Sequence, residues 1–161
     1  MPIYDNDGTT NYQIGKVYDN DGTAQHQIGK VYDWDGTASS LIYSADETFE
    51  ISKKSADGTV NQMKWFNTPV TGFTSVTLTI VVDGTQDIFY GGIGTQQASG
   101  AVSTTAPSGA LYNVKSVNGD KKGTHSKTLS LNASATYYLY AGVYTGNKAN
   151  NGSVKVTAIF S

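Results

Sequence analysis

Residues 3 to 44 repeat a fourteen-residue pattern almost three times, and this repeat constrains the fold more than any other feature. The segments Ile3–Lys16 and Val17–Lys30 are identical at ten of fourteen positions. A third copy, starting at Val31, keeps Val-Tyr-Asp-x-Asp-Gly-Thr before it diverges. Repeats must be identified first because they dictate architecture.

Each copy is predicted to form a short β-hairpin. The Asp-Gly pair in "YDNDGT" suits a two-residue turn, which needs positive φ, and Ile3-Tyr4 and Tyr12-Gln13-Ile14 can lie as antiparallel strands. A lone hairpin with about three apolar side chains is marginal in water. The repeats therefore need partners, and a homotrimer is the preferred stoichiometry. The residues expected to mediate docking or assembly are Ile3, Tyr4, Ile14, Val17, Tyr18, Ile28, Val31, Tyr32 and Trp34.

The Asp-Asn-Asp-Gly sequence also resembles the start of an EF-hand calcium loop, but the third acidic position and the closing Glu are missing. A hairpin turn explains Asp7-Gly8, Asp21-Gly22 and Asp35-Gly36 without an ion. We therefore predict no metal site, and calcium binding at these turns stays open.

From Ala45 the repeat stops, and the sequence changes to short runs of alternating apolar and polar residues. These runs are separated by turn signals such as Asp83-Gly84 and Asn118-Gly119. This pattern predicts an all-β chain in which residues 1–44 form hairpin repeats and residues 45–161 form an antiparallel β-sandwich of jelly-roll type. The expected strands are Thr48–Lys54, Val60–Asn67, Ser75–Asp83, Gln86–Ile93, Ala110–Val117, Ser126–Asn132, Thr136–Thr145 and Ser153–Phe160. The Ser/Thr/Gly-rich stretch Gly94–Gly109 is predicted to be a long exposed loop.

Composition argues against several function classes. The net charge is −2, and all eleven basic residues are Lys, so nucleic-acid binding is not expected. Cysteine is absent, and no cofactor is predicted. The longest purely apolar run, Ile80–Val82, is too short to span a membrane. The sequence begins without the basic and apolar regions of a signal peptide.

Catalysis is not expected either, because His26 and His125 lack a neighbouring nucleophile and base, and no pair of facing carboxylates is evident. The notable site is "ATYYLYAGVYT". If Tyr137, Leu139, Ala141 and Val143 face the core, Tyr138, Tyr140 and Tyr144 line the opposite face, where they could stack on sugars or pack under a neighbouring sheet or loop.

The residues Ile3-Tyr4-Asp5-Asn6-Asp7-Gly8 and Ile14-Gly15-Lys16, with their equivalents in Val17–Lys30 and Val31–Thr37, resemble the tandem repeats "IYxNDGGxxxxIKK". Such repeats occur in tail, fibre and other virion proteins of phages and prophages of Gram-positive bacteria. The resemblance covers about a quarter of the chain, and Thr9 replaces a common second Gly.

The resemblance implies a structural virion protein, with an N-terminal segment that docks on capsid, neck or tail proteins and a projecting C-terminal domain. Synthesis in the host cytoplasm and a location on the virion surface would reconcile the surface-like composition with the missing signal peptide. The alternative is a carbohydrate- or receptor-binding adhesion module that engages a host surface glycan.

Overall fold

The computed structural model describes the chain except residues 1–2, 7–10, 15–16, 21–24, 29, 35–38, 45 and 103–105, and it describes side chains from Asp46 onward outside that last gap. The chain divides into two compact units, Met1–Glu47 with Ser161 and Thr48–Phe160.

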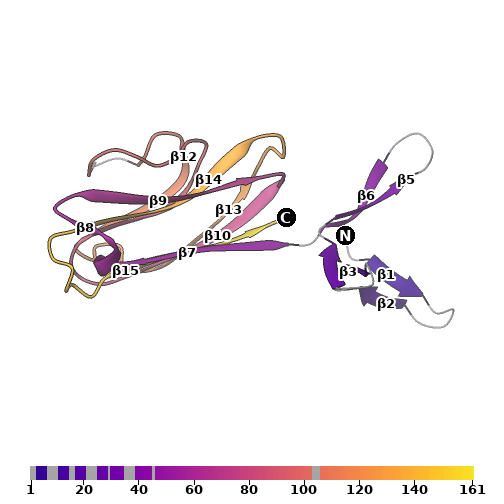
Figure 1. Ribbon diagram of the computed structural model, residues 1–161, viewed down its shortest axis with the longest axis horizontal. Helices are drawn as coiled ribbons and strands as arrows, with labels where there is room; N and C mark the ends of the chain where they lie inside the picture. Colours follow the sequence, from indigo (N-terminus) through magenta and orange to yellow (C-terminus); the bar gives the residue numbers. More distant parts are fainter. Residues whose placement is uncertain are drawn as a thin grey trace. The chain divides into compact units, whose positions relative to one another are not determined.

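The N-terminal unit contains antiparallel strand pairs (Figure 1). In the first two pairs, Ile3 lies opposite Ile14 and Val17 lies opposite Ile28. The Asp-Gly turns and the side chains predicted to mediate docking lie outside the described residues, so their assigned role stays a prediction. The pairs are β1 (Ile3–Asn6) with β2 (Asn11–Ile14), β3 (Val17–Asn20) with β4 (Gln25–Ile28), and β5 (Lys30–Trp34) with β6 (Ser39–Ser44).

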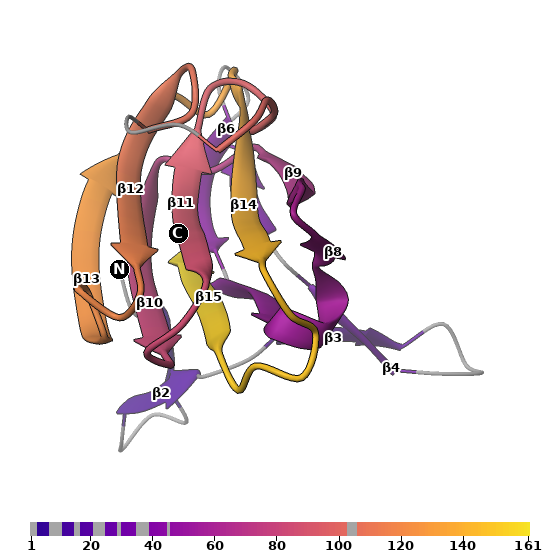
Figure 2. The same cartoon turned by 90° about the vertical axis from the view of Figure 1, so that its left-hand side faces the viewer.

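The second unit is a β-sandwich, which confirms the predicted all-β class. Its two sheets form the two layers in Figure 1, and Figure 2 shows strands of the five-stranded sheet side by side. The four-stranded sheet has the order β13 (Gly123–Ser130), β10 (Ser75–Asp83), β15 (Ser153–Phe160), β7 (Glu47–Lys54). The five-stranded sheet has β12 (Ala110–Val117), β11 (Ile88–Gly94) and β14 (Thr136–Thr145) in order, with β8 (Thr59–Val60) and β9 (Met63–Thr71) both pairing with β14. A 3₁₀ turn, η1 (Ser55–Asp57), follows β7.

The core lies between the two sheets and follows the predicted alternation. On β10, every second residue from Val76 to Val82 is buried, while Thr77 is exposed. On β14, the predicted inward residues Tyr137, Leu139, Ala141 and Val143 all belong to the core. Because side chains alternate across a strand, the remaining residues of β14 must face outward.

Most strand bounds agree with the sequence analysis to within two residues, and two differ by more. The strand expected at Val60–Asn67 is Met63–Thr71, with Thr59–Val60 as a separate short strand. The strand includes Pro69, which cannot donate a backbone hydrogen bond. Proline is tolerated there because β9 pairs with β14 alone among the described strands and so is an edge strand. The strand expected at Ser126–Asn132 is Gly123–Ser130.

Candidate functional site

The aromatic face is the outer face of the five-stranded sheet, and we define it by Trp65, Tyr90, Tyr138, Tyr140 and Tyr144. Cross-strand pairing places Tyr90 opposite Gly142, and Tyr140 opposite Gly92. Each of these two tyrosines therefore lies opposite a glycine. Because glycine has no side chain, it leaves space beside each ring, and the ring can lie across the sheet.

Tyr140 lies across Gly92 and is almost completely buried, with 1% of its surface exposed. A Cβ on Gly92 would come within 2.5 Å of the Tyr140 hydroxyl and 2.3 Å of the Tyr112 carbonyl oxygen. The hydroxyl donates a hydrogen bond to Asn113 Oδ1 at 3.0 Å. Burial raises the pKa of the Tyr140 phenol well above its ordinary value. Tyr140 is therefore part of the packing of this face.

Trp65, on β9, covers the neighbouring glycine. Its ring would meet a Cβ on Gly142 at 2.6 Å. The ring centroid lies 5.0 Å from that of Tyr90 and 6.0 Å from that of Tyr140. On the other side of the strand, Phe66 packs against the core. The two adjacent rings therefore point to opposite faces of the sheet.

The stretch after β11 is attached to β9. Asn67 forms two hydrogen bonds with the backbone of Ala98: its Nδ2 donates to the carbonyl oxygen at 3.1 Å, and its Oδ1 accepts from the N–H at 2.8 Å. Trp65 Nε1 donates to the Gly100 carbonyl oxygen at 2.9 Å. Ala98 is buried. The prediction of a wholly exposed loop over Gly94–Gly109 is therefore wrong at this point.

The three tyrosines proposed for ligand binding have different surroundings. Tyr138 and Tyr144 are half-buried and present part of their surface to solvent. Tyr140 presents almost none, because Trp65 and the hydrogen bond to Asn113 hold it in place. A ligand role stays a prediction for Tyr138 and Tyr144. The glycines opposite the rings are the signal that could have identified the packing, since glycine inside a strand marks close approach.

The loop end is the end of the sandwich formed by residues 55–57, 83–87, 118–122 and 146–152. Asp87 joins three of these loops from a buried position with φ of 72°. Its carboxylate accepts hydrogen bonds from Asn150 Nδ2 at 2.7 Å, Thr145 Oγ1 at 3.0 Å and Gly146 N at 3.2 Å. Its carbonyl oxygen accepts from Asn118 N at 2.9 Å. The carboxylate is thus stabilised by three hydrogen bonds from neutral donors.

Further contacts connect the other loops. Ser55 and Gly152 bond in both directions, with N–H to carbonyl at 2.9 Å and Gly152 N to Ser55 Oγ at 3.0 Å. Lys122 Nζ lies 2.7 Å from Asp83 Oδ1. That hydrogen bond and the backbone N–H of Gly84 lower the pKa of the Asp83 carboxyl. Hydrogen bonds and an ion pair therefore connect the four loops of the loop end to one another.

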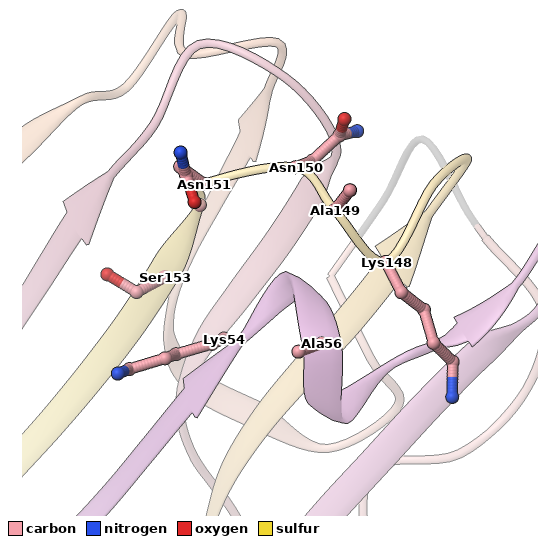
Figure 3. Close-up of a pocket in the computed structure, with 8 residues that line it drawn as sticks. Lys54, Ala56, Lys148, Ala149, Asn150, Asn151 and Ser153 are labelled. Atoms are coloured by element: carbon pink, nitrogen blue, oxygen red, sulfur yellow. The ribbon is translucent and has the colours of Figure 1, made fainter.

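A hollow of about 410 Å³ lies at this end, lined by Lys54, Ala56, Gly152, Ser153 and residues 148–151. In Figure 3 the Lys54 and Lys148 side chains lie on either side of it, and their ammonium groups point away from each other. The lining offers ammonium, amide and hydroxyl groups without a carboxylate. Such a surface can donate hydrogen bonds to a polar ligand but has no general base.

His125 Nε2 lies 2.9 Å from the Lys121 carbonyl oxygen, while the His26 side chain lies outside the described residues. In the part of the chain that the structure describes, no group of three or more His, Cys, Asp and Glu residues could hold a metal ion. Over the same residues, no helix is long and apolar enough to cross a membrane.

A scan against protein-family models and a search of curated proteins both found no match to the chain.

Proposed function

We propose that the chain is a non-enzymatic structural protein of a tailed-phage virion, either a head-fibre or decoration protein or a tail-associated fibre subunit. The observation that carries this proposal is the tandem repeat. Copies with about three apolar side chains each are too poor in core to be independent domains, so they need a binding partner. We assign residues 1–44 to docking on a capsid, neck or tail protein, with homotrimerisation as the preferred mode of assembly.

The connectivity of the second unit supports a projecting domain. The chain enters the sandwich at the start of β7, and each of the loops 55–57, 83–87, 118–122 and 146–152 lies at the opposite end of its strand. Chain connectivity therefore joins residues 1–47 to the end of the sandwich that is opposite the loop end.

The strand order supports a jelly roll as the finer description of the fold. The eight main strands fall into the orders β7-β15-β10-β13 and β9-β14-β11-β12, and after β9 only the β11–β12 connection stays within one sheet. The two Greek keys of a jelly roll, a fold of viral capsid and lectin domains, would give such an order. Fold alone does not determine function, so the repeats remain the principal support.

The virion assignment can be tested on particles released by the cells that produce this chain. Antibodies against residues 48–161 should label one fixed site on purified particles in electron micrographs. Deletion of residues 3–44 should abolish labelling, while Lys127→Gln, an exposed change in the sandwich, should leave it intact. Recovery of the chain only in the particle-free fraction would overturn the proposal.

A second candidate is a carbohydrate-binding module, which the half-exposed Tyr138 and Tyr144 favour. Tyrosine combines an apolar ring with a polar hydroxyl, and both can contact a sugar. Tyr138→Ala and Tyr144→Ala should weaken binding to host-cell glycans at least tenfold. Ile159→Ala removes an exposed apolar side chain from β15, in the four-stranded sheet, and should not change it. Unchanged binding in both tyrosine variants would exclude the aromatic face as the glycan site.

A further inference from the structure

The near-neutral total charge conceals an unequal distribution of charge. Residues 1–47 contain two lysines and eight acidic residues, a net charge of −6, whereas residues 48–161 contain nine lysines and five acidic residues, a net charge of +4. Asp87, one of those five acids, is buried. The surface of the sandwich is therefore cationic, and it would attract an anionic ligand.

Two of these lysines meet at one aromatic ring. Lys53, on β7, places its Nζ 4.3 Å from the centroid of the Phe66 ring, and Lys64, on β9, places its Nζ 5.1 Å from it. Such cation–π contacts restrain the long lysine side chains. Among the described residues, neither Lys53 nor Lys64 forms an ion pair.

The ring belongs to a groove between β7 and β9, the edge strands of the two sheets. The groove has a volume of about 470 Å³ and is lined by residues 50–53 and 66–68. Its one acid, Glu50, is held by Lys155 at 2.7 Å. Ser52 and Thr68 add hydroxyl groups to the lining, whereas the amide of the third polar residue, Asn67, is bonded to the Ala98 backbone. The β7/β9 groove thus combines the Lys53 ammonium group with hydroxyl groups, and the Lys64 ammonium group lies beside it at the Phe66 ring.

Lysines on edge strands also have a protective role, because inward-pointing charges prevent edge-to-edge pairing of sheets. That role requires only that each strand carry a charge. It does not require lysines from two sheets to share one ring beside a groove whose carboxylate is already paired. The convergence of Lys53 and Lys64 is the feature that indicates a ligand.

We propose that the β7/β9 groove binds an acidic polysaccharide, with Lys53 and Lys64 contacting its phosphate or carboxylate groups. Two neighbouring ammonium groups can bind either anion, and the neutral groups of the lining can form hydrogen bonds with sugar hydroxyls. A nucleic acid fits less well, because the chain has no Arg to form bidentate contacts with phosphates and bases. The inference concerns a site other than the aromatic face, and it does not depend on the virion assignment.

The test measures binding of the full chain to dextran phosphate, polygalacturonate and unmodified dextran by calorimetry at low salt. At least one of the two charged polymers should bind, and dextran should not. The Lys53→Gln/Lys64→Gln double variant should bind the charged polymer at least tenfold more weakly. Phe66→Leu, which keeps both charges but removes the ring, should weaken binding to a smaller extent.

The matched control is Lys121→Gln/Lys127→Gln, which removes the same charge from exposed positions on another part of the sandwich. It should change binding less than threefold. Absence of binding to both charged polymers, or equal losses in the two double variants, would overturn the inference. Tighter binding to single-stranded DNA than to either polysaccharide would also overturn it. None of these outcomes bears on whether the chain is incorporated in particles.

Discussion

At the scale of single residues, Asp87 has the most demanding position in the sandwich. Its buried carboxylate accepts three hydrogen bonds, and its backbone is left-handed. Asn tolerates the same backbone conformation, so Asp87→Asn changes only the side chain. The amide keeps one acceptor oxygen but loses the negative charge that strengthens these hydrogen bonds, which should lower the free energy of unfolding by about 1–3 kcal/mol.

Urea denaturation would measure this loss. Asp57→Asn is the control, because Asp57 is exposed and its carboxylate accepts the N–H of Lys54. Since changes at exposed positions are usually small, we expect a difference within roughly 0.5 kcal/mol there. Equal losses at the two positions would show that the network around Asp87 does not stabilise the loop end.

Tyr140 should make stability depend on alkaline pH. An unfolded tyrosine ionises near pH 10, as an approximate reference value. Because burial raises the pKa of Tyr140, the folded chain keeps the phenol neutral above that pH. The stabilisation from this group is therefore complete below about pH 10 and is lost as pH rises towards the folded pKa.

Tyr140→Phe should accordingly flatten the fall in unfolding free energy above pH 10, by up to about 1.4 kcal/mol per pH unit. At neutral pH the variant should lose about 1 kcal/mol, since the bond to Asn113 is removed. Denaturant titrations between neutral pH and pH 11 would measure both effects. Tyr138→Phe has the same number of tyrosines and should retain the wild-type slope, so identical slopes in the two variants would contradict the prediction.

At the scale of the strand, the close approach at Gly92 determines how β11 packs. A methyl group there would meet the Tyr112 carbonyl oxygen at 2.3 Å, and that backbone atom cannot move without disturbing β12. Gly92→Ala should therefore lower the free energy of unfolding by about 1–3 kcal/mol, as overpacking does. Gly146→Ala has no atom within 4 Å of the new methyl group and should be nearly neutral in thermal denaturation. A neutral Gly92→Ala would disprove the packing argument.

The strands themselves could be predicted because alternation is local. Val76, Leu78, Ile80 and Val82 are enough to define β10 and its buried face. The packing of Tyr140 could not be predicted, because it depends on Gly92, which lies forty-eight positions away in the sequence. Likewise, no local pattern pairs Lys53 with Lys64, since their meeting at Phe66 requires two edge strands from different sheets. Alternation predicts which side chains face outward, but the strand order determines which of these side chains lie next to one another.

At the scale of the whole molecule, the question is what the repeats add to a sandwich that already has its own core. Among the residues whose side chains the structure describes, the buried core extends from Ile51 to Phe160, and residues 45–161 should therefore fold without the repeats. The repeats contain too few apolar side chains to be stable alone, and association of three copies would enclose a thin shared core. Assembly should therefore depend on residues 1–44.

Light scattering of the full chain and of residues 45–161 would separate these contributions. We expect a trimer for the full chain and a monomer for the shorter one, with similar circular dichroism per residue in the sandwich region. Ile14→Asp/Ile28→Asp in the full chain should also give a monomer, because it places charges in the shared core. A trimer formed by residues 45–161 would transfer assembly to the sandwich. A monomeric full chain would leave docking on another particle protein as the role of the repeats.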